Sequence, residues 1–332
     1  SASIERQLRQ GTTLSIGYVG ARAHHLLVLT PASPGNAERC LSVSDPSQVA
    51  AGSDTCGPFS EGGLFTRADG STVQARGPFG PEFDGITYQK TIGWSNYNAL
   101  EVTVKHHAGA GELLAAYTYS KSLDNSSSLS EEVNPIEPGI SKAISAFDIR
   151  HNFALSYVTP LPLQRLLHGP RLLTSGWSVS GITRFTTGMP VTLYNNDDTS
   201  LIGSMPNGIN NNGVDTPNYD GGALKLNLNP RNGRAAFNAA RFSMPALGQI
   251  GNAPRRFFYG PGMENFDVAL QKTLHVGDAR TLLLRAESFN VFNHAQFFGP
   301  EAINGNPDSS NFGKIVNANP PRQLQLAVKF SF

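Results

Sequence analysis

This 332-residue chain contains two histidine doublets, His24-His25 and His106-His107. Their side chains have the chemistry to bind a metal ion. A pair of imidazoles can ligate zinc when both rings reach the same point. Both doublets fall in segments with strand patterning, where neighbouring side chains point to opposite faces. We therefore expect the two rings of each doublet to point to opposite faces of a sheet, without a metal centre between them.

Two loop stretches, 195–200 (NNDDTS) and 207–215 (NGINNNGVD), are rich in oxygen donors. Carboxylate and amide oxygens are the ligands that calcium prefers. The D-x-D-x-D-G spacing of a calcium loop is missing, so we expect a solvated external loop without a bound metal.

Covalent catalysis is not expected from this chain. The sequence contains no G-x-S-x-G, H-E-x-x-H or glycine-rich phosphate loop. We therefore expect neither enzyme activity nor a cofactor. With a net charge of +1, nucleic acid is also an unexpected partner, because phosphate binding needs a clustered basic surface.

Charged residues recur on one side of several predicted strands. Arg285 and Glu287 lie two positions apart, as strand residues on a common face do, and Glu101 and Lys105 are spaced similarly. Arg184 lies opposite the apolar side of its strand. We expect these five residues to face the lumen of a barrel, either as ordinary ion pairs of the wall or as groups that steer a substrate.

The two cysteines, Cys40 and Cys56, lie in one polar, glycine-rich stretch without metal-ligand spacing. A disulfide that closes a surface loop is the favoured interpretation, and it would indicate an oxidising compartment.

Nine segments alternate apolar and polar residues, the pattern of a strand with two different faces. Most are long enough to cross a bilayer when tilted. They are 2–9, 12–26, 97–107, 112–124, 151–158, 177–185, 264–274, 279–292 and 324–332.

The connections alternate between short and long. Three links are tight turns, and the link at about 161–175 is modest. The long ones fall at about 27–96, 125–147, 190–263 and 294–320. In an up-and-down barrel, this alternation puts every long loop at one rim, as in outer-membrane barrels. The alternative is a soluble carbohydrate-binding β-sandwich, but its strands are usually shorter.

Several motifs resemble those of one family. They are GYVGARAHHL, YNALEVTVKH, YTYSKSLDNSSS, FDIRHNFALSYVTPLP, GWSVSGITRFTTGMPVT, RAESFNVFNHAQF and PRQLQLAVKFSF. In this order they resemble the C-terminal barrel part of Oar-like TonB-dependent receptors, which are outer-membrane proteins of Gram-negative bacteria.

The resemblance implies an all-β, antiparallel, up-and-down transmembrane β-barrel, of which residues 1–332 would supply about nine strands. Such receptors resemble 22-stranded barrels with an internal plug, and neither a plug nor a TonB-contacting segment is recognisable here. Nine strands leave two open edges, which lipid does not tolerate. We therefore expect a fragment whose contact with the TonB system would need a missing N-terminal region.

The last segment has a further predicted role. It ends on an aromatic residue after a strict alternation, the form that the barrel assembly machinery reads in outer-membrane proteins. This strand could bind by edge-strand addition, because its unpaired peptide groups can hydrogen-bond to another strand and its alternating side chains can fit that strand's pockets. The residues that match this signal are Leu324, Leu326, Val328, Phe330 and Phe332.

Two functions follow from the resemblance. In the first, the external loops capture an unknown ligand and the full-length receptor takes it up across the outer membrane. In the second, the barrel is a surface adhesion or structural protein without uptake. In both, the partners are outer-membrane lipid and the assembly machinery, and the location is the outer membrane of a Gram-negative bacterium.

Overall fold

A computed structural model shows the fold of the chain. It describes residues 1–38, 41, 64–66, 72–74, 87–167, 169–195, 198–202, 214–227, 229–230, 233–277 and 280–332. Among these residues no helix is both long and apolar enough to cross a membrane.

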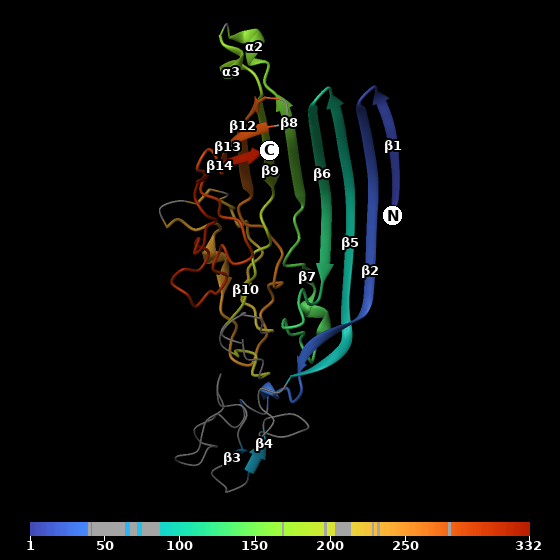
Figure 1. Cartoon of the computed structure of the whole chain (residues 1–332). Coiled ribbons are helices and arrows are strands. Elements are labelled where there is room, and N and C mark those ends of the chain that lie inside the picture. The colour runs from blue at the N-terminus through green and yellow to red at the C-terminus, as the bar shows by residue number, and fades with distance from the viewer. Residues whose placement is uncertain are drawn as a thin grey trace.

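Nine strands, each paired with its neighbours in chain order, form the main path of a ten-stranded antiparallel sheet, and the short strand β7 pairs with β6 beside this path (Figure 1). The fold class predicted from the sequence is therefore confirmed. The strands are β1 (Ala2–Arg9), β2 (Thr12–Pro31), β5 (Thr87–Ala108), β6 (Gly111–Asp124), β8 (His151–Pro160), β9 (Trp177–Thr186), β12 (Met263–Val276), β13 (Arg280–Phe289) and β14 (Gln323–Ser331).

Smaller elements lie in the connections. Short strands are β3 (Leu64–Thr66), β4 (Thr72–Gln74), β7 (Ala143–Ile144), β10 (Asn218–Tyr219) and β11 (Phe242–Ser243). Single helical turns are η2 (Pro138–Ser141), α2 (Leu163–Leu166), α3 (Arg171–Thr174) and η3 (Ala239–Arg241). The two edge strands of the large sheet, β1 and β14, each have one partner within the described residues. The nine long strands therefore form an open sheet, which we call the wall.

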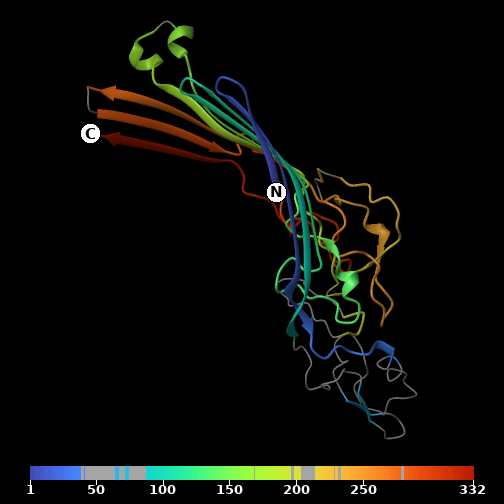
Figure 2. The same ribbon diagram turned by 90° about the vertical axis from the view of Figure 1, so that its right-hand side faces the viewer.

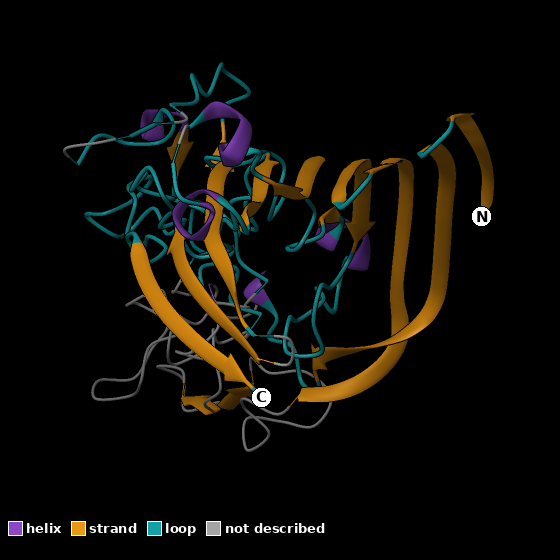
Figure 3. Ribbon diagram, turned by 45° about the horizontal axis from the view of Figure 1, so that its top comes forward, coloured by secondary structure: helices purple, strands orange, loops and turns teal. Residues whose placement is uncertain are grey.

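The wall is curved, and the long loops lie on its concave side (Figure 3). The loops gather toward one end of the strands, while α2 and α3 lie at the opposite end (Figures 1 and 2). A β-sandwich would instead cover the apolar face of the sheet with a second sheet.

The register places the apolar residues of neighbouring strands side by side on the outer face. Ile16 pairs with Val102, Val102 with Tyr117, and Tyr117 with Phe153. Many large apolar side chains of this face are exposed, such as Leu100 at 42%. An apolar surface of this extent indicates contact with lipid.

Aromatic rings border this apolar belt on both sides. Near the long loops, Phe185 contacts Phe266 edge-on with ring centres 5.4 Å apart, and Phe266 contacts Phe292 at 5.0 Å. Near the short turns, the ammonium of Lys272 lies 4.7 Å from the Trp177 ring. Positions 177 and 185 of β9 are about 26 Å apart at roughly 3.3 Å per residue. Because the strands of outer-membrane barrels are tilted by about 35–45°, this length covers roughly 20 Å of their apolar band, which is about 25 Å tall.

The glycine of β9 shows how tightly the outer face is packed. A Cβ atom on Gly181 would lie 2.5 Å from the hydroxyl oxygen of Tyr157, which is directly opposite on β8. The ring of Tyr157 therefore covers a position that only glycine can occupy, an arrangement known to stabilise glycines in sheets.

Two predicted boundaries are wrong. The connection placed at 27–96 begins only after Pro31, and β5 already begins at Thr87, so both strands extend beyond the apolar belt. They do so because backbone pairing continues past a bulge near His24 and Leu26, through the apolar run 26–29 of β2. The link at about 161–175, which was predicted to be of modest length, contains the two helical turns α2 and α3.

A positive charge should destabilise the wall much more on the outer face of β5 than on its inner face. Replacing Val102 with arginine places a cation on the outer face at the middle of its apolar stretch, which should destabilise the wall by about 2–4 kcal/mol. The matched variant Thr103→Arg points to the inner face and should cost far less. Urea unfolding in phospholipid vesicles measures both, and equal losses for the two variants would contradict the assignment of faces.

Candidate functional site

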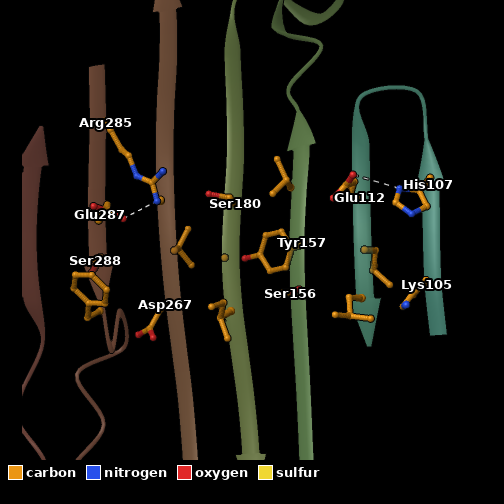
Figure 4. A pocket seen from close by; sticks show the side chains of 18 residues that line it. Lys105, His107, Glu112, Ser156, Tyr157, Ser180, Asp267, Arg285, Glu287 and Ser288 are labelled. Atoms are coloured by element: carbon orange, nitrogen blue, oxygen red, sulfur yellow. Dashed lines mark hydrogen bonds and ion pairs between the residues drawn. The ribbon is translucent and has the colours of Figure 1, made fainter. Parts of the chain in front are cut away.

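The inner face of the wall carries a cavity of about 500 Å³, and Figure 4 shows the side chains that line it. Its lining comes from six consecutive strands of the sheet, β5 to β13. The ionisable residues among those that line it are Lys105, His107, Glu112, Asp267, Arg285 and Glu287.

Strand register brings these residues together from distant parts of the sequence. Lys105 pairs with Leu114, and Leu114 pairs with Ser156 on the next strand. Ser156 pairs with Ile182, which in turn lies opposite Asp267. Residues that are opposite in a sheet share a face, so one row across the wall carries a cation at one end and a carboxylate at the other.

Ion pairs in the cavity are local and partly solvated. The Arg285 guanidinium lies 2.7 Å from the Glu287 carboxylate, with the two side chains 39% and 20% exposed. His107 lies 3.4 Å from Glu112 with both side chains largely exposed. Exposed pairs of this kind contribute about 0–1 kcal/mol, so their stabilising effect on the wall is small.

The cavity is suited to non-covalent contact. In the described part of the chain, neither Ser156 nor Ser180 hydrogen-bonds to a histidine, and no group of three His, Cys, Asp or Glu residues could share a metal ion. What the lining offers is fixed charge and hydroxyl groups on a curved polar surface.

The five residues predicted to face the lumen all lie on the inner face. Lys105, Arg285 and Glu287 line the large cavity. Glu101 lines a smaller one of about 260 Å³, and Arg184 donates from Nε to the Asn152 side-chain oxygen at 3.2 Å.

The inner face is less polar than expected, because Leu114, Val158, Ile182 and Phe289 also line the cavity. The exposed fractions of these four side chains range from 39% at Leu114 to 54% at Ile182. A surface of this kind is suited to partial covering by another molecule or by another part of the protein.

A second cavity of about 840 Å³ lies at the loop end of β9 and β12, and the sequence analysis missed it. Its aromatic lining includes Phe257, Phe258, Tyr259 and Phe297, and Arg150 lies beside them. The run FFYGPG at 257–262 was the available signal, since exposed loops seldom carry three successive aromatic residues.

Tyr259 is held at the rim of this second cavity. Its hydroxyl donates to the Asp148 carboxylate at 2.6 Å, and the Arg150 guanidinium donates to the same hydroxyl at 3.2 Å. Burial, followed by the bond to Asp148, raises the pKa of Tyr259 to about 12, so this phenol is neutral at physiological pH.

The long loops form a packed unit with a core of their own. Val191, Leu193, Phe237, Phe258 and Ile303 lie in one buried cluster, contributed by the loop between β9 and β12 and the loop before β14. Hydrogen bonds also attach the loops to the inner face of β6. The hydroxyl of Ser120 donates to the Ile149 carbonyl at 3.0 Å, and the Ser122 amide donates to Asp148 at 2.6 Å.

Two adjacent arginines join the loops to one another. Arg255 Nε lies 2.9 Å from Glu131, and Arg256 also bonds to Glu131 while donating to the Ile144 carbonyl at 2.7 Å. All three charged side chains are at most 6% exposed. A buried charge is tolerated only when it is paired, so removing one partner is far more costly here than at the surface.

The pKa values reflect this pairing. Burial alone would raise the pKa of Glu131, but Arg255 and Arg256 outweigh it and hold this pKa below its ordinary value of 4.5. Burial lowers the pKa of Arg255 to about 10 despite the neighbouring carboxylate, so Arg255 remains charged at neutral pH.

The residues of the predicted assembly signal lie along the outer face of β14, where they are strongly exposed. Leu326 is 83% exposed and Phe332 is 94% exposed. Within the described residues β14 pairs only with β13, so its other edge presents unpaired peptide groups. Cys40 and Cys56 lie outside the described residues, and the predicted disulfide stays a prediction.

The two histidine doublets differ in whether their side chains follow the alternation expected of a strand. His106 and His107 are on opposite faces, with His106 2.8 Å from the Thr12 hydroxyl and His107 beside Glu112. Simple alternation fails at the other doublet, because His25 has a φ of 57° and interrupts the register of β2.

The expectation of a solvated loop at 195–200 and 207–215 is wrong for the residues that the structure describes. Asn195, Asp198 and Asp215 are each 1% exposed. They are buried because the chain returns on itself, with the Asn195 amide donating to the Asp215 carbonyl at 3.0 Å.

An antiparallel wall with an apolar outer face, aromatic borders and a charged inner face defines the class of transmembrane β-barrels. Comparison with known families agrees with this class, because the model of the outer membrane beta barrel domain matches residues 1–325. The chain therefore belongs to the outer membrane beta barrel domain family, and its location is the outer membrane.

Among solved structures, the chain is similar to the outer membrane transporter YddB from Escherichia coli, with 11% identity and a TM-score of 0.47. The match covers 99% of this chain and 31% of that one, so the chain spans about a third of the transporter's length. Comparison with curated protein sequences gives no match.

The buried arginine pair predicts a specific weakness of the loop unit. Glu131→Gln leaves two buried guanidinium groups without their shared carboxylate, which should destabilise the loop unit by about 3–5 kcal/mol. Because the pKa of Glu131 is lowered in the folded state, its contribution is present above the ordinary pKa and is lost as the pH falls through the folded value.

Urea unfolding of the loops as a function of pH measures both effects. The matched control is Glu137→Gln, since Glu137 is an exposed residue of the same loop. The idea fails if Glu131→Gln unfolds at the same urea concentration as Glu137→Gln, or if the acid sensitivity survives in Glu131→Gln.

Proposed function

We propose that this chain is part of the barrel of a TonB-dependent, Oar-like receptor that takes up a ligand across the outer membrane. A plug and a TonB-contacting region would belong to the N-terminal part of such a receptor. Membership in the outer membrane beta barrel domain family supports the barrel and its location. The motifs that resemble Oar-like receptors support the assignment to a TonB-dependent receptor.

One observation carries this proposal: the loop unit and both cavities lie on the inner side of the wall. The loop unit is attached through Ser120 and Ser122, whose side chains face inward. The aromatic cavity lies at the loop end, and the charged cavity lies farther along the strands. This order suits a ligand that enters through the loops and then passes along a polar surface.

In this mechanism the chain acts only by binding. Phe257, Phe297 and Tyr259 would contact apolar or planar parts of the ligand, while Arg150 would contact an anionic or hydrogen-bonding part. Arg285 and Glu287 would meet the plug or the passing ligand. No covalent step and no cofactor are proposed.

Other partners follow from the same assignment. The outer face would contact outer-membrane lipid, and the free edge of β14 would add to a strand of the barrel assembly machinery during insertion. The exposed apolar side chains of β14 suit that role, because lipid or a second strand must cover them.

Adhesion is the second candidate, and the packed core of the loop unit favours it. A loop unit with its own buried cluster presents a fixed external surface, as a protein that holds another cell or a polysaccharide needs. Dependence on energy separates this function from uptake.

Uptake predicts a solute that disappears from the medium only when the inner membrane is energised. Cells with and without the parent gene are incubated with a mixed metabolite extract, and depletion is followed by mass spectrometry. For a receptor, at least one solute should be depleted only by producing cells, and a protonophore should abolish the depletion.

The variant Phe297→Ala should weaken that depletion, whereas Phe332→Leu, which is far from the cavity, should leave the rate per inserted protein unchanged. Binding that is insensitive to the protonophore, together with cell adhesion, would favour the second candidate and count against uptake.

A further inference from the structure

Two aspartates in the loop between β9 and β12 are buried beside one another. Asp198 and Asp215 are each 1% exposed, and they come from the two oxygen-rich stretches that flank this part of the loop. Burial of a carboxylate is costly in itself, and a second carboxylate beside it adds repulsion between like charges.

A single hydroxyl lies between them. The Ser200 hydroxyl oxygen is 3.2 Å from Asp198 Oδ1 and 3.0 Å from Asp215 Oδ2. A hydroxyl has one proton and can therefore donate to only one of these oxygens. The other contact brings two oxygen lone pairs together, which is unfavourable unless a positive charge lies near them.

A second observation points to a missing positive charge. The other carboxylate oxygen of Asp215, Oδ1, is buried and has no hydrogen-bond partner in the described structure. Burial, followed by the negative charge of Asp198, raises the pKa of Asp215 well above its ordinary value. Among the described residues, none of the groups that shift this pKa is a cation, since the remaining ones are hydrogen bonds with Ser200 and Asp198.

We infer that Asp198, Asp215 and the Ser200 hydroxyl hold a divalent cation of the calcium type in this loop. Calcium takes six to eight oxygen ligands and tolerates irregular geometry, so carboxylates and a hydroxyl from different parts of a loop suit it. The cation would accept lone pairs from both carboxylates and from Ser200, which removes the repulsion and gives the buried oxygen a partner.

The site would control how the loops are held together. The Ile202 amide donates to Asp198 Oδ1 at 3.1 Å, and the Ile202 carbonyl accepts from the Gly35 amide at 2.7 Å. Residue 35 follows β2, so a cation at Asp198 would stabilise a contact between two external loops. This inference concerns loop stability and is independent of whether the receptor takes up a ligand.

The test titrates calcium into the full chain, folded in detergent free of lipopolysaccharide and treated first with a chelator. Isothermal titration should show saturable binding with a Kd of about 10⁻⁴ to 10⁻³ M, the range of extracellular calcium modules. Limited proteolysis should show slower cleavage of the loop between β9 and β12 when calcium is added. Magnesium at equal concentration should protect less, because it demands a stricter octahedral geometry.

The informative variants are Asp215→Asn and Asp198→Asn, each of which should weaken calcium binding at least tenfold. The matched control is Asp220→Asn, which removes the same charge from an exposed residue of the same loop that pairs with Arg241. This control should retain both the binding and the protection.

Two results would overturn the inference. In one, calcium neither binds nor protects the original protein, and Asp215→Asn is more resistant to protease than the original, which would mean that the two carboxyls share only a proton. In the other, Asp220→Asn lowers calcium affinity as much as Asp215→Asn does, which would mean that the ion binds to the general acidity of the loop.

Discussion

Hydrocarbon offers no hydrogen-bond partner to a peptide group, and this constraint determines the architecture of the wall. Among the nine long strands of the wall, β2, β5, β6, β8, β9, β12 and β13 meet the constraint by pairing along both of their edges. Of these nine strands, β1 and β14 have a single partner within the described residues. Because pairing is continuous, successive side chains point to opposite faces of the wall. The alternation of apolar and polar residues in the sequence therefore gives one apolar and one polar surface.

The polar surface in turn determines where the loops can fold. Inward-facing Ser120 and Ser122 give the loops hydrogen-bond partners at the end of β6, and Arg255 and Arg256 then join separate loops through one carboxylate. The loop unit therefore depends on a few buried polar contacts as much as on its aromatic core. Such contacts specify one arrangement, because any other arrangement would leave a buried charge unpaired.

Much of the wall was predictable from the sequence, because a period of two residues is a local signal. The nine strands, their order and the inward position of Lys105, Arg184 and Arg285 follow from alternation alone. The extension of β2 and β5 was not predictable in this way, since residues 26–29 of β2 are all apolar and the alternation disappears there.

The features of the loops were hidden for a different reason. Asp198 and Asp215 meet across a stretch of seventeen positions, and Arg255 reaches Glu131 across more than a hundred. No local pattern reports such contacts, because they arise from the path of the whole loop. Polar composition predicted solvation, whereas the structure uses the same residues as an interior.

The length of the paired strands β2 and β5 has a mechanical consequence. With 22 residues in β5, this ribbon measures roughly 70 Å at about 3.3 Å per residue, more than twice the height of the hydrocarbon layer. Both strands bend near the bulge at His25 before they end (Figure 1). The ribbon acts as a stiff arm above the headgroups, so a load applied at its tip would reach the wall between β1 and β6 as torque instead of being absorbed by slack chain.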